Sequence, residues 1–241
     1  MLPIEFKSDA RVTGTLFMDA RRVRRLTALL PSGICVTQSS HPDRHHVERF
    51  IEQTYRRHFG AEIERHYPNL MSVYDARGNA LAAVGFRLAA EGPLFLEQYL
   101  QSPVEAAIRQ ATGTPVRREE VVEIGNLASA GGGASVFLFV ALAAYLRQQN
   151  LVHAVVTGTN TLRRAFTRLG IQFLELASAD PAALADDGAS WGSYYRADPK
   201  VIAGGIQPAF ARLEPYLPPE HNADLKLLFS RLHLPGSRDV L

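Results

Sequence analysis

A glutamate inside an apolar strand is the side chain of this 241-residue sequence with the clearest potential for acid–base chemistry. Glu123 stands between Val122 and Ile124, and residues 121–127 read as a strand. Burial among apolar neighbours raises the pKa of a carboxyl group toward a value that suits proton transfer at neutral pH. Glu123 is therefore a candidate general base, with an ion-paired or surface glutamate as the structural alternative.

Three consecutive glycines follow the same strand. Gly131, Gly132 and Gly133 tolerate positive φ and let backbone N–H groups approach a ligand closely. The helix expected from Ala134 adds unpaired N–H donors and the positive end of its dipole, and Ser135 adds a hydroxyl. This strand–loop–helix predicts an anion-binding site. Because no Walker-type lysine follows the glycines, an ordinary turn stays the alternative.

Four more polar side chains are candidates for the same site, among them Glu97, which interrupts an apolar run, and Arg87, which is charged within a predicted strand. Arg87 is expected to pair with Glu123 or to hold an anionic acceptor. Glu97 is a candidate ligand for an amine. Tyr194 is a candidate acid for a leaving thiolate, with packing as the alternative; of two adjacent tyrosines in an extended segment, only one points inward. Asn126 shares a site with the strand glutamate only if a β-bulge intervenes, because side chains alternate along a regular strand.

Composition narrows the classes of partner and cofactor. The formal charge of +2 is close to neutral, so the overall composition argues neither for nor against a nucleic-acid partner. The arginine cluster at 21–25 is the only dense basic patch and reads as solvated surface or as a contact for an anionic partner, so we expect no nucleic-acid partner. The eight histidines show no ligand spacing, so we expect no metal. The first residues lack signal-peptide features, and the apolar run at 136–146 is shorter than the roughly 20 residues of a membrane-spanning helix. A cytoplasmic protein without a transmembrane segment is the expectation.

Hydrophobic periodicity and turn residues indicate a single α/β domain. Two antiparallel strands are expected around the turn at 75–79, followed by a βαβαβ pattern from residue 121. The fold class is therefore a mixed central sheet, antiparallel in its first half and parallel in its second half, flanked by helices. The predicted strands are 25–30, 34–37, 70–74, 80–88, 121–127, 153–158 and 171–177, and the predicted helices are 47–59, 104–111, 134–149, 162–169 and 220–234.

This organisation divides the chain into three parts. Residues 1–24 are an N-terminal extension, residues 25–217 the domain, and residues 218–241 a C-terminal amphipathic helix and tail. The apolar stripe of that last helix docks on the core, on a partner subunit or on a membrane surface, with docking on protein favoured. A homodimer is left open.

The antiparallel strands, the glycine loop and the segment Thr159-Asn-Thr-Leu-Arg-Arg-Ala-Phe-Thr-Arg-Leu-Gly-Ile171 together resemble the GNAT acyltransferases. The similarity is greatest to their acyl-homoserine-lactone synthase branch, whose paired arginine and glutamate strand motifs resemble Val84-Gly-Phe-Arg-Leu88, Gly92-Pro-Leu-Phe-Leu96 and Val122-Glu-Ile-Gly-Asn-Leu-Ala128. The resemblance implies a GNAT-like sheet whose central strand carries a bulge. It also implies that the donor, an acyl-CoA or an acyl-carrier protein phosphopantetheine, is bound by Leu127, Ala128, Gly131, Gly132, Gly133, Ala134, Ser135 and Asn160.

As a whole, the chain is most similar to the thermostable hemolysin family. The motifs that carry this similarity are His66-Tyr-Pro-Asn-Leu70, Leu94-Phe-Leu-Glu-Gln-Tyr-Leu100, Glu123-Ile-Gly-Asn-Leu-Ala128 and Trp191-Gly-Ser-Tyr-Tyr195. The family name refers to a lytic phenotype, whereas the GNAT resemblance implies acyl transfer. Gly125-Asn126 stands where the synthase branch has Ser-Arg, which argues against homoserine-lactone formation.

The sequence thus favours an N-acyltransferase that moves an acyl group, fatty chains included, from acyl-CoA or acyl-carrier protein to a small-molecule amine. Aminolysis of a thioester needs a base for the amine and an acid for the thiolate, and Glu123, Arg87, Glu97 and Tyr194 are the candidates for the reacting side of the site. A membrane-active lytic protein and a non-catalytic module that binds an acyl ligand are the alternatives.

Overall fold

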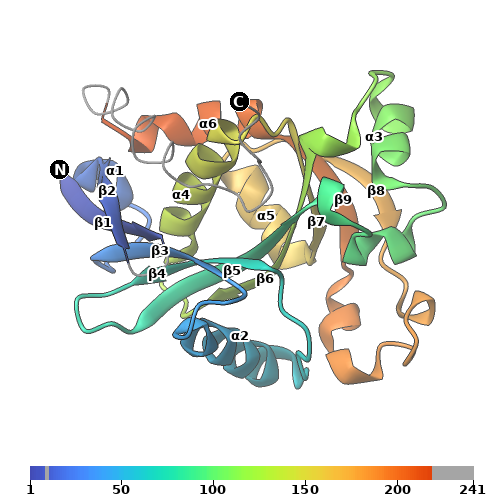
Figure 1. Cartoon of the computed structure of the whole chain (residues 1–241), viewed down its shortest axis with the longest axis horizontal. Helices are drawn as coiled ribbons and strands as arrows, with labels where there is room; N and C mark the ends of the chain where they lie inside the picture. Colours follow the sequence, from blue (N-terminus) through green and yellow to red (C-terminus); the bar gives the residue numbers. More distant parts are fainter. Residues whose placement is uncertain (9–10, 219–241) are drawn as a thin grey trace, which may run out of the picture.

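The computed structural model describes residues 1–8 and 11–218, and this part of the chain contains one nine-stranded sheet (Figure 1). The strands are arranged in the order β2-β1-β3-β4-β5-β6-β7-β9-β8. Their bounds are Leu2–Ser8 (β1), Arg11–Met18 (β2), Gly33–Gln38 (β3), Asn69–Tyr74 (β4), Ala80–Leu88 (β5), Val121–Ser129 (β6), His153–Gly158 (β7), Leu174–Ser178 (β8) and Lys200–Gly205 (β9).

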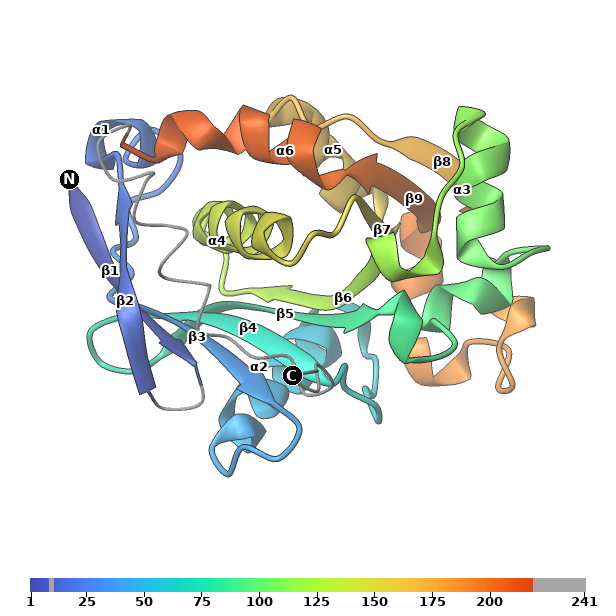
Figure 2. The ribbon, with the colours of Figure 1, turned by 45° about the horizontal axis from the view of Figure 1, so that its top comes forward.

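Helices cover both faces of the sheet. Figure 2 shows α4, α5 and α6 on one face and α2 on the other. The α-helix bounds are Ala20–Val23 (α1), Arg44–Phe59 (α2), Val104–Thr112 (α3), Ser135–Gln148 (α4), Asn160–Arg168 (α5) and Ile206–Leu213 (α6). Helix α4 is apolar on all sides and lies buried between the sheet and α6, as expected for a helix without a polar face. No helix in the described ranges is both long and apolar enough to cross a membrane.

Helix α2 forms and ends as its sequence predicts. Val47, Ile51 and Tyr55 recur at four-residue spacing and form its buried stripe. The helix stops at Gly60, which adopts φ +67° and caps the last turn through its backbone N–H. This buried stripe holds the helix across β4, β5 and β6.

The predicted mixed sheet of a GNAT-like fold is confirmed. Strands β3, β4, β5 and β6 are antiparallel neighbours, and β6 pairs with β7 in parallel. β7 and β8 also run in the same direction, because both are antiparallel to β9. The prediction did not include β9, which is inserted between them and makes both of those pairings antiparallel.

Two features of β6 create space in the middle of the sheet. Its pairing with β7 ends at Ile124 and Val156, so the strands diverge beyond these residues. Its pairing with β5 shifts between Gly85–Gly125 and Ala83–Ala128, which leaves a bulge at Asn126, whose φ is +51°. The bulge that Asn126 needs in order to share a site with Glu123 is therefore present.

The N-terminal region differs from the prediction. Residues 25–30 do not form a strand; they follow α1 as turns and irregular chain. Instead, β1 and β2, within the predicted extension 1–24, are strands of the central sheet, because Ile4, Phe6, Leu16 and Met18 alternate into the core. The predicted helix 220–234 lies outside the described residues.

Candidate active site

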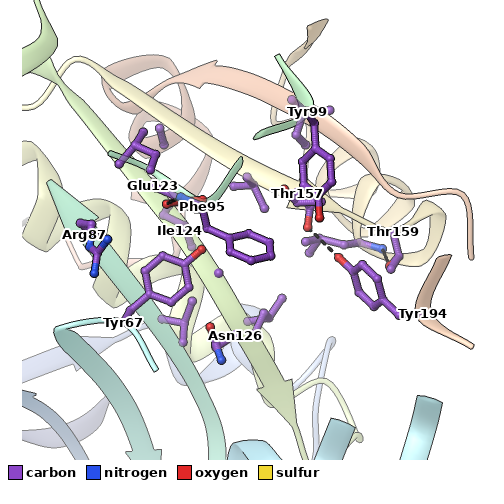
Figure 3. A pocket seen from close by; sticks show the side chains of 18 of the residues that line it. Tyr67, Arg87, Phe95, Tyr99, Glu123, Ile124, Asn126, Thr157, Thr159 and Tyr194 are labelled. Atoms are coloured by element: carbon purple, nitrogen blue, oxygen red, sulfur yellow. Dashed lines mark hydrogen bonds between the residues drawn. The ribbon is translucent and has the colours of Figure 1, made fainter. Parts of the chain in front are cut away.

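A cavity of about 830 Å³ opens where β6 and β7 diverge (Figure 3). This volume falls within the range of small-molecule sites. Figure 3 shows Glu123, Tyr67 and Arg87 on one side of it and Tyr194 with Thr157 on the other. Of the predicted site residues, Arg87, Glu123, Leu127 and Tyr194 line this cavity, as does Asn126.

Glu123 is fully buried and has several hydrogen-bond donors. Its carboxylate accepts the backbone N–H of Phe95 at 2.9 Å and that of Leu96 at 2.8 Å, and it is hydrogen-bonded to the side chain of Tyr67. Burial raises its pKa, whereas these donors and the charge of Arg87 act in the opposite direction. A 1% exposed carboxyl group with a raised pKa is poised to exchange a proton within the cavity.

Tyr67 is a site residue that the sequence reasoning did not identify. Its ring lies against Gly85 and Gly125, which are directly paired on β5 and β6. A Cβ added at Gly85 would come within 2.7 Å of the Tyr67 Cβ, and one at Gly125 within 2.6 Å of its ring. The absence of a Cβ at both glycines thus lets the Tyr67 ring lie directly on β5 and β6, with its hydroxyl at Glu123. A pair of glycines inside two strands was the available signal.

Arg87 is paired in register with Glu123 across β5 and β6 and so lies on the same face of the sheet. Its guanidinium donates to the carbonyl oxygen of Pro93 at 3.2 Å. Its charge acts on the pKa of Glu123 over a longer distance than an ion pair. Arg87 lines the cavity, where the predicted contact with an anionic acceptor stays a prediction.

Glu97 lies away from the cavity wall. Its oxygens accept two bonds from Arg118, at 2.6 and 3.0 Å, and also the backbone N–H groups of Leu94 and Val104. Hydrogen bonding to Arg118 lowers its pKa to about 2. These contacts fix the segment that presents the amides of Phe95 and Leu96 to Glu123. The predicted contact with an amine acceptor is not among them.

Both tyrosines of the 194–195 pair face the cavity. The expectation that only one points inward applied to an extended segment, but Tyr194–Ala197 is a 3-10 helix. Tyr194 donates to the carbonyl oxygen of Thr157 at 3.0 Å, and Tyr195 shares a hydrogen bond of 2.6 Å with Tyr99. Burial raises the pKa of Tyr194, so its hydroxyl stays protonated at neutral pH.

The glycine loop has the backbone that its sequence predicts. Gly131, Gly132 and Gly133 adopt φ +90°, +60° and +82° and are exposed. Within the described residues, the N–H groups of Gly132 and Gly133 donate to no other group. Residues 26–29 support the loop: a Cβ at Gly133 would lie 3.0 Å from that of Thr27. These free N–H groups after the end of β6 can donate hydrogen bonds to an anion.

The remaining predicted donor-binding residues have different positions. Ala128 and Ala134 are buried in the core and can contribute only backbone groups. Ser135 is the first residue of α4, and Asn160 is the first residue of α5, next to Thr159 on the cavity wall. Like the glycines, these four residues lie outside the cavity lining. In residues 1–8 and 11–218, no group of three or more His, Cys, Asp or Glu side chains is placed to hold a metal ion.

Comparison with known proteins gives a family and a fold. The family model described as thermostable hemolysin matches residues 37–210. No curated protein matches the sequence significantly.

Among solved structures, the AHL synthase LasI has a TM-score of 0.53 at 12% identity, covering 77% of this chain and 95% of LasI. FeeM, an N-acyl amino acid synthase from uncultured soil microbes, has a TM-score of 0.51 at 13% identity, covering 77% of this chain and 96% of FeeM. TofI in an apo form has a TM-score of 0.50 at 14% identity, covering 78% of this chain and 98% of TofI. At these identities the likeness concerns the fold alone.

Proposed function

From a chain that belongs to the thermostable hemolysin family and has the fold of acyl-transferring synthases, we propose an N-acyltransferase that moves an acyl group from acyl-CoA or acyl-carrier protein to a small amine. The observation that carries this proposal is the divergence of β6 and β7, which opens into a cavity containing a buried carboxyl group with a raised pKa. Both donors are intracellular thioesters, in keeping with a cytoplasmic site of action.

The divergent strands suit the pantetheine part of either donor. Pantetheine is an extended diamide, and an extended amide chain can pair with an exposed strand edge as a further strand does. Beyond Ile124, the residues Gly125, Asn126 and Leu127 have no strand partner on the β7 side. The backbone N–H groups of Gly132 and Gly133, which follow β6 in the chain, then donate hydrogen bonds to the phosphates of the acyl donor.

The inner part of the cavity suits a fatty acyl chain. It is lined by apolar side chains from three helices and by β7 and β9, with no charged group among those that α4, α5 and α6 contribute. The contributions from the helices are Phe139, Leu142, Ala143 and Leu146 from α4, Leu162 and Phe166 from α5, and Ile206, Ala209 and Leu213 from α6. Such a surface binds methylene groups by burying apolar area.

In the proposed reaction, the amine nitrogen attacks the thioester carbon, the new C–N bond forms and the C–S bond breaks. A proton from the nitrogen passes through the Tyr67 hydroxyl to Glu123, and the leaving sulfur receives one from Tyr194; transfer between the two sides restores both groups. Arg87 is retained as the residue that attracts an anionic group of the acceptor. Glu97 positions residues 94–96 and does not contact the acceptor.

A non-catalytic module that binds an acyl ligand is the second candidate. The observation that favours it is the complete set of donors around Glu123, which resembles a structural anchor. Substitution of Glu123 by Gln separates the two functions: a catalyst loses turnover, whereas a binding module keeps its affinity for the acyl ligand. A lytic activity of the family would then be measured on the same variant with erythrocyte lysis.

Calorimetric titration with CoA and with short- and long-chain acyl-CoAs tests the donor site. Gly132→Asp places a negative charge in the loop, and Gly132→Asn is the matched neutral control, since both residues tolerate positive φ. We expect binding to the wild type and to the Asn variant and loss of binding in the Asp variant. Equal binding by all three proteins would contradict a donor site in this loop.

Acyl transfer itself is then measured as release of free thiol. The acceptor panel consists of alkylamines, amino acids and polyamines, with hydroxylamine as a small and weakly basic probe. If acyl-CoA binds but no acceptor causes thiol release, acyl transfer from CoA is contradicted. Acyl-carrier protein would then be tested as the donor with the same panel of acceptors.

A further inference from the structure

His66 is a partly buried titratable side chain on the cavity wall that the proposed reaction has not used. Its Nε2 atom lies 3.0 Å from Oε1 of Glu52 on α2. The histidine side chain is 10% exposed, whereas that of Glu52 is 41% exposed. The pair therefore connects the wall of the cavity with solvent at the surface of α2.

The second ring nitrogen of His66 lacks a hydrogen-bond partner among the described residues. Nδ1 is buried and has no hydrogen-bond partner in the described part of the chain. Buried polar atoms nearly always have a partner. Three side-chain atoms of the described residues share this state, and two of them, Nδ1 of His66 and Oγ1 of Thr157, belong to residues that line the cavity. Within the described chain, both atoms therefore lack a partner beside the cavity, and Nδ1 of His66 belongs to a side chain that also contacts Glu52.

Glu52 determines what Nδ1 can do. An ionised carboxylate only accepts hydrogen bonds, so its contact with His66 requires the hydrogen on Nε2. In the neutral ring, Nδ1 then carries the lone pair and accepts a proton. A carboxylate that orients a histidine in this way also stabilises the imidazolium that forms.

The proton balance of the proposed reaction needs a second acceptor. An alkylamine enters at neutral pH as an ammonium ion and must lose one proton before it can attack. A second proton leaves the nitrogen as the amide forms and ends on the sulfur of the leaving thiol. The transfer thus releases one proton to solvent, and Glu123, at 1% exposure, has almost no direct contact with solvent.

We propose that Glu52 and His66 form the proton exit of this site: Nδ1 of His66 takes the proton of the incoming ammonium ion, the imidazolium gives its Nε2 proton to solvent on the Glu52 side, and the ring then returns to the Nε2–H tautomer that Glu52 requires. This inference rests on the proposed acyl transfer. It divides the work between two acceptors, since Tyr67 and Glu123 handle the proton that is passed to the thiolate. Other titratable groups on the same cavity wall, from α2, the 60–68 segment, β5 and β6, are Tyr55, Glu62, Glu64, Arg65, Tyr67, Arg87 and Glu123.

His66→Gln tests the proposal, because its amide nitrogen can still donate to Glu52 but offers no titratable lone pair. His58→Gln, on the exposed side of α2, is the matched control. With the best alkylamine of the panel, we expect kcat/KM of His66→Gln to fall by about 10²-fold or more. With hydroxylamine, which is already neutral at pH 7, the loss should stay below about tenfold, because no ammonium proton has to be removed.

Equal losses with both acceptors, or no loss with either, would overturn the proton exit while leaving acyl transfer intact. A wild type that acylates neither acceptor would refute acyl transfer and the proton exit together, so the two failures are distinct. Unchanged acyl-CoA binding shows that the variant is folded. If it is not, the exposed Glu52→Gln takes its place, with the same contrast between acceptors expected at about tenfold.

Discussion

Replacing Gly125 by Ala should damage the site through one collision that can be worked out from the structure. The added Cβ would lie 2.6 Å from two ring carbons of Tyr67, whereas ordinary contact begins near 3.4 Å, so the ring must move by roughly 0.8 Å. Overpacking of this kind costs about 1–3 kcal/mol. Weakening the hydrogen bond from Tyr67 to Glu123 adds about 1 kcal/mol, and alanine in a strand returns about 0.5–1 kcal/mol.

The expected net result is a loss of about 1–3.5 kcal/mol in the free energy of unfolding, together with a fall in kcat of up to about 10²-fold from the displaced hydroxyl. Urea unfolding followed by the fluorescence of Trp191, the single tryptophan, measures the first, and thiol release measures the second. Gly33→Ala is the matched control, because its Cβ would lie 3.7 Å from the nearest atom.

Tyr67→Ala provides the decisive background. With the ring removed, Gly125→Ala should become nearly neutral, so that the double-mutant cycle shows a coupling of about 2 kcal/mol. If Gly125→Ala lowers the free energy of unfolding equally with and without the tyrosine ring, the contact with Gly125 does not position Tyr67, and the reasoning fails.

Three further predictions concern other parts of the site. Tyr194→Phe should lower kcat with donor affinity unchanged and cost about 1 kcal/mol of stability for the lost bond to Thr157; a fall in donor affinity alone would contradict its role as an acid. Pairing with Arg118 lowers the pKa of Glu97 to about 2, so the contribution of this carboxylate to stability, about 2 kcal/mol, should be complete above about pH 4.5 and be lost as pH falls toward 2. Denaturation of wild type and Glu97→Gln between pH 7 and 2 should show their free energies of unfolding converge at low pH. A constant difference between the two proteins would refute this prediction. Gly133→Ala should destabilise the loop by about 1–3 kcal/mol, because positive φ and the contact with Thr27 both oppose a Cβ; an unchanged thermal midpoint and CoA affinity would be the contrary result.

The sequence was informative wherever one residue and its neighbours carry the signal. Glu123 in an apolar strand is buried, and its pKa is raised, as its neighbours indicate. The run of Gly131 to Gly133 adopts the positive φ that only glycine takes readily. Each of these properties depends on local chain chemistry, which can be read directly.

Features that depend on distant parts of the chain could not be predicted in this way. Glu97 was read as a ligand because it interrupts an apolar run, but Arg118, 21 positions later, engages its carboxylate. The role of Tyr67 requires two glycines on neighbouring strands to meet beneath one ring. The strands β1 and β2 were missed because their residues look polar on average, although Ile4 and Phe6 in β1 and Leu16 and Met18 in β2 are buried.

The insertion of β9 between β7 and β8 has a consequence for biosynthesis. Residues of β9 and α6 line the cavity, and these two elements stand at 200–213, close to the end of the described sequence. A nascent chain on the ribosome therefore cannot complete the cavity until nearly all of the described sequence has emerged, even though the glycine loop and Glu123 leave much earlier. Long-range strand pairing of this kind is slow, and a thioester that binds only the finished cavity would favour the folded state by mass action.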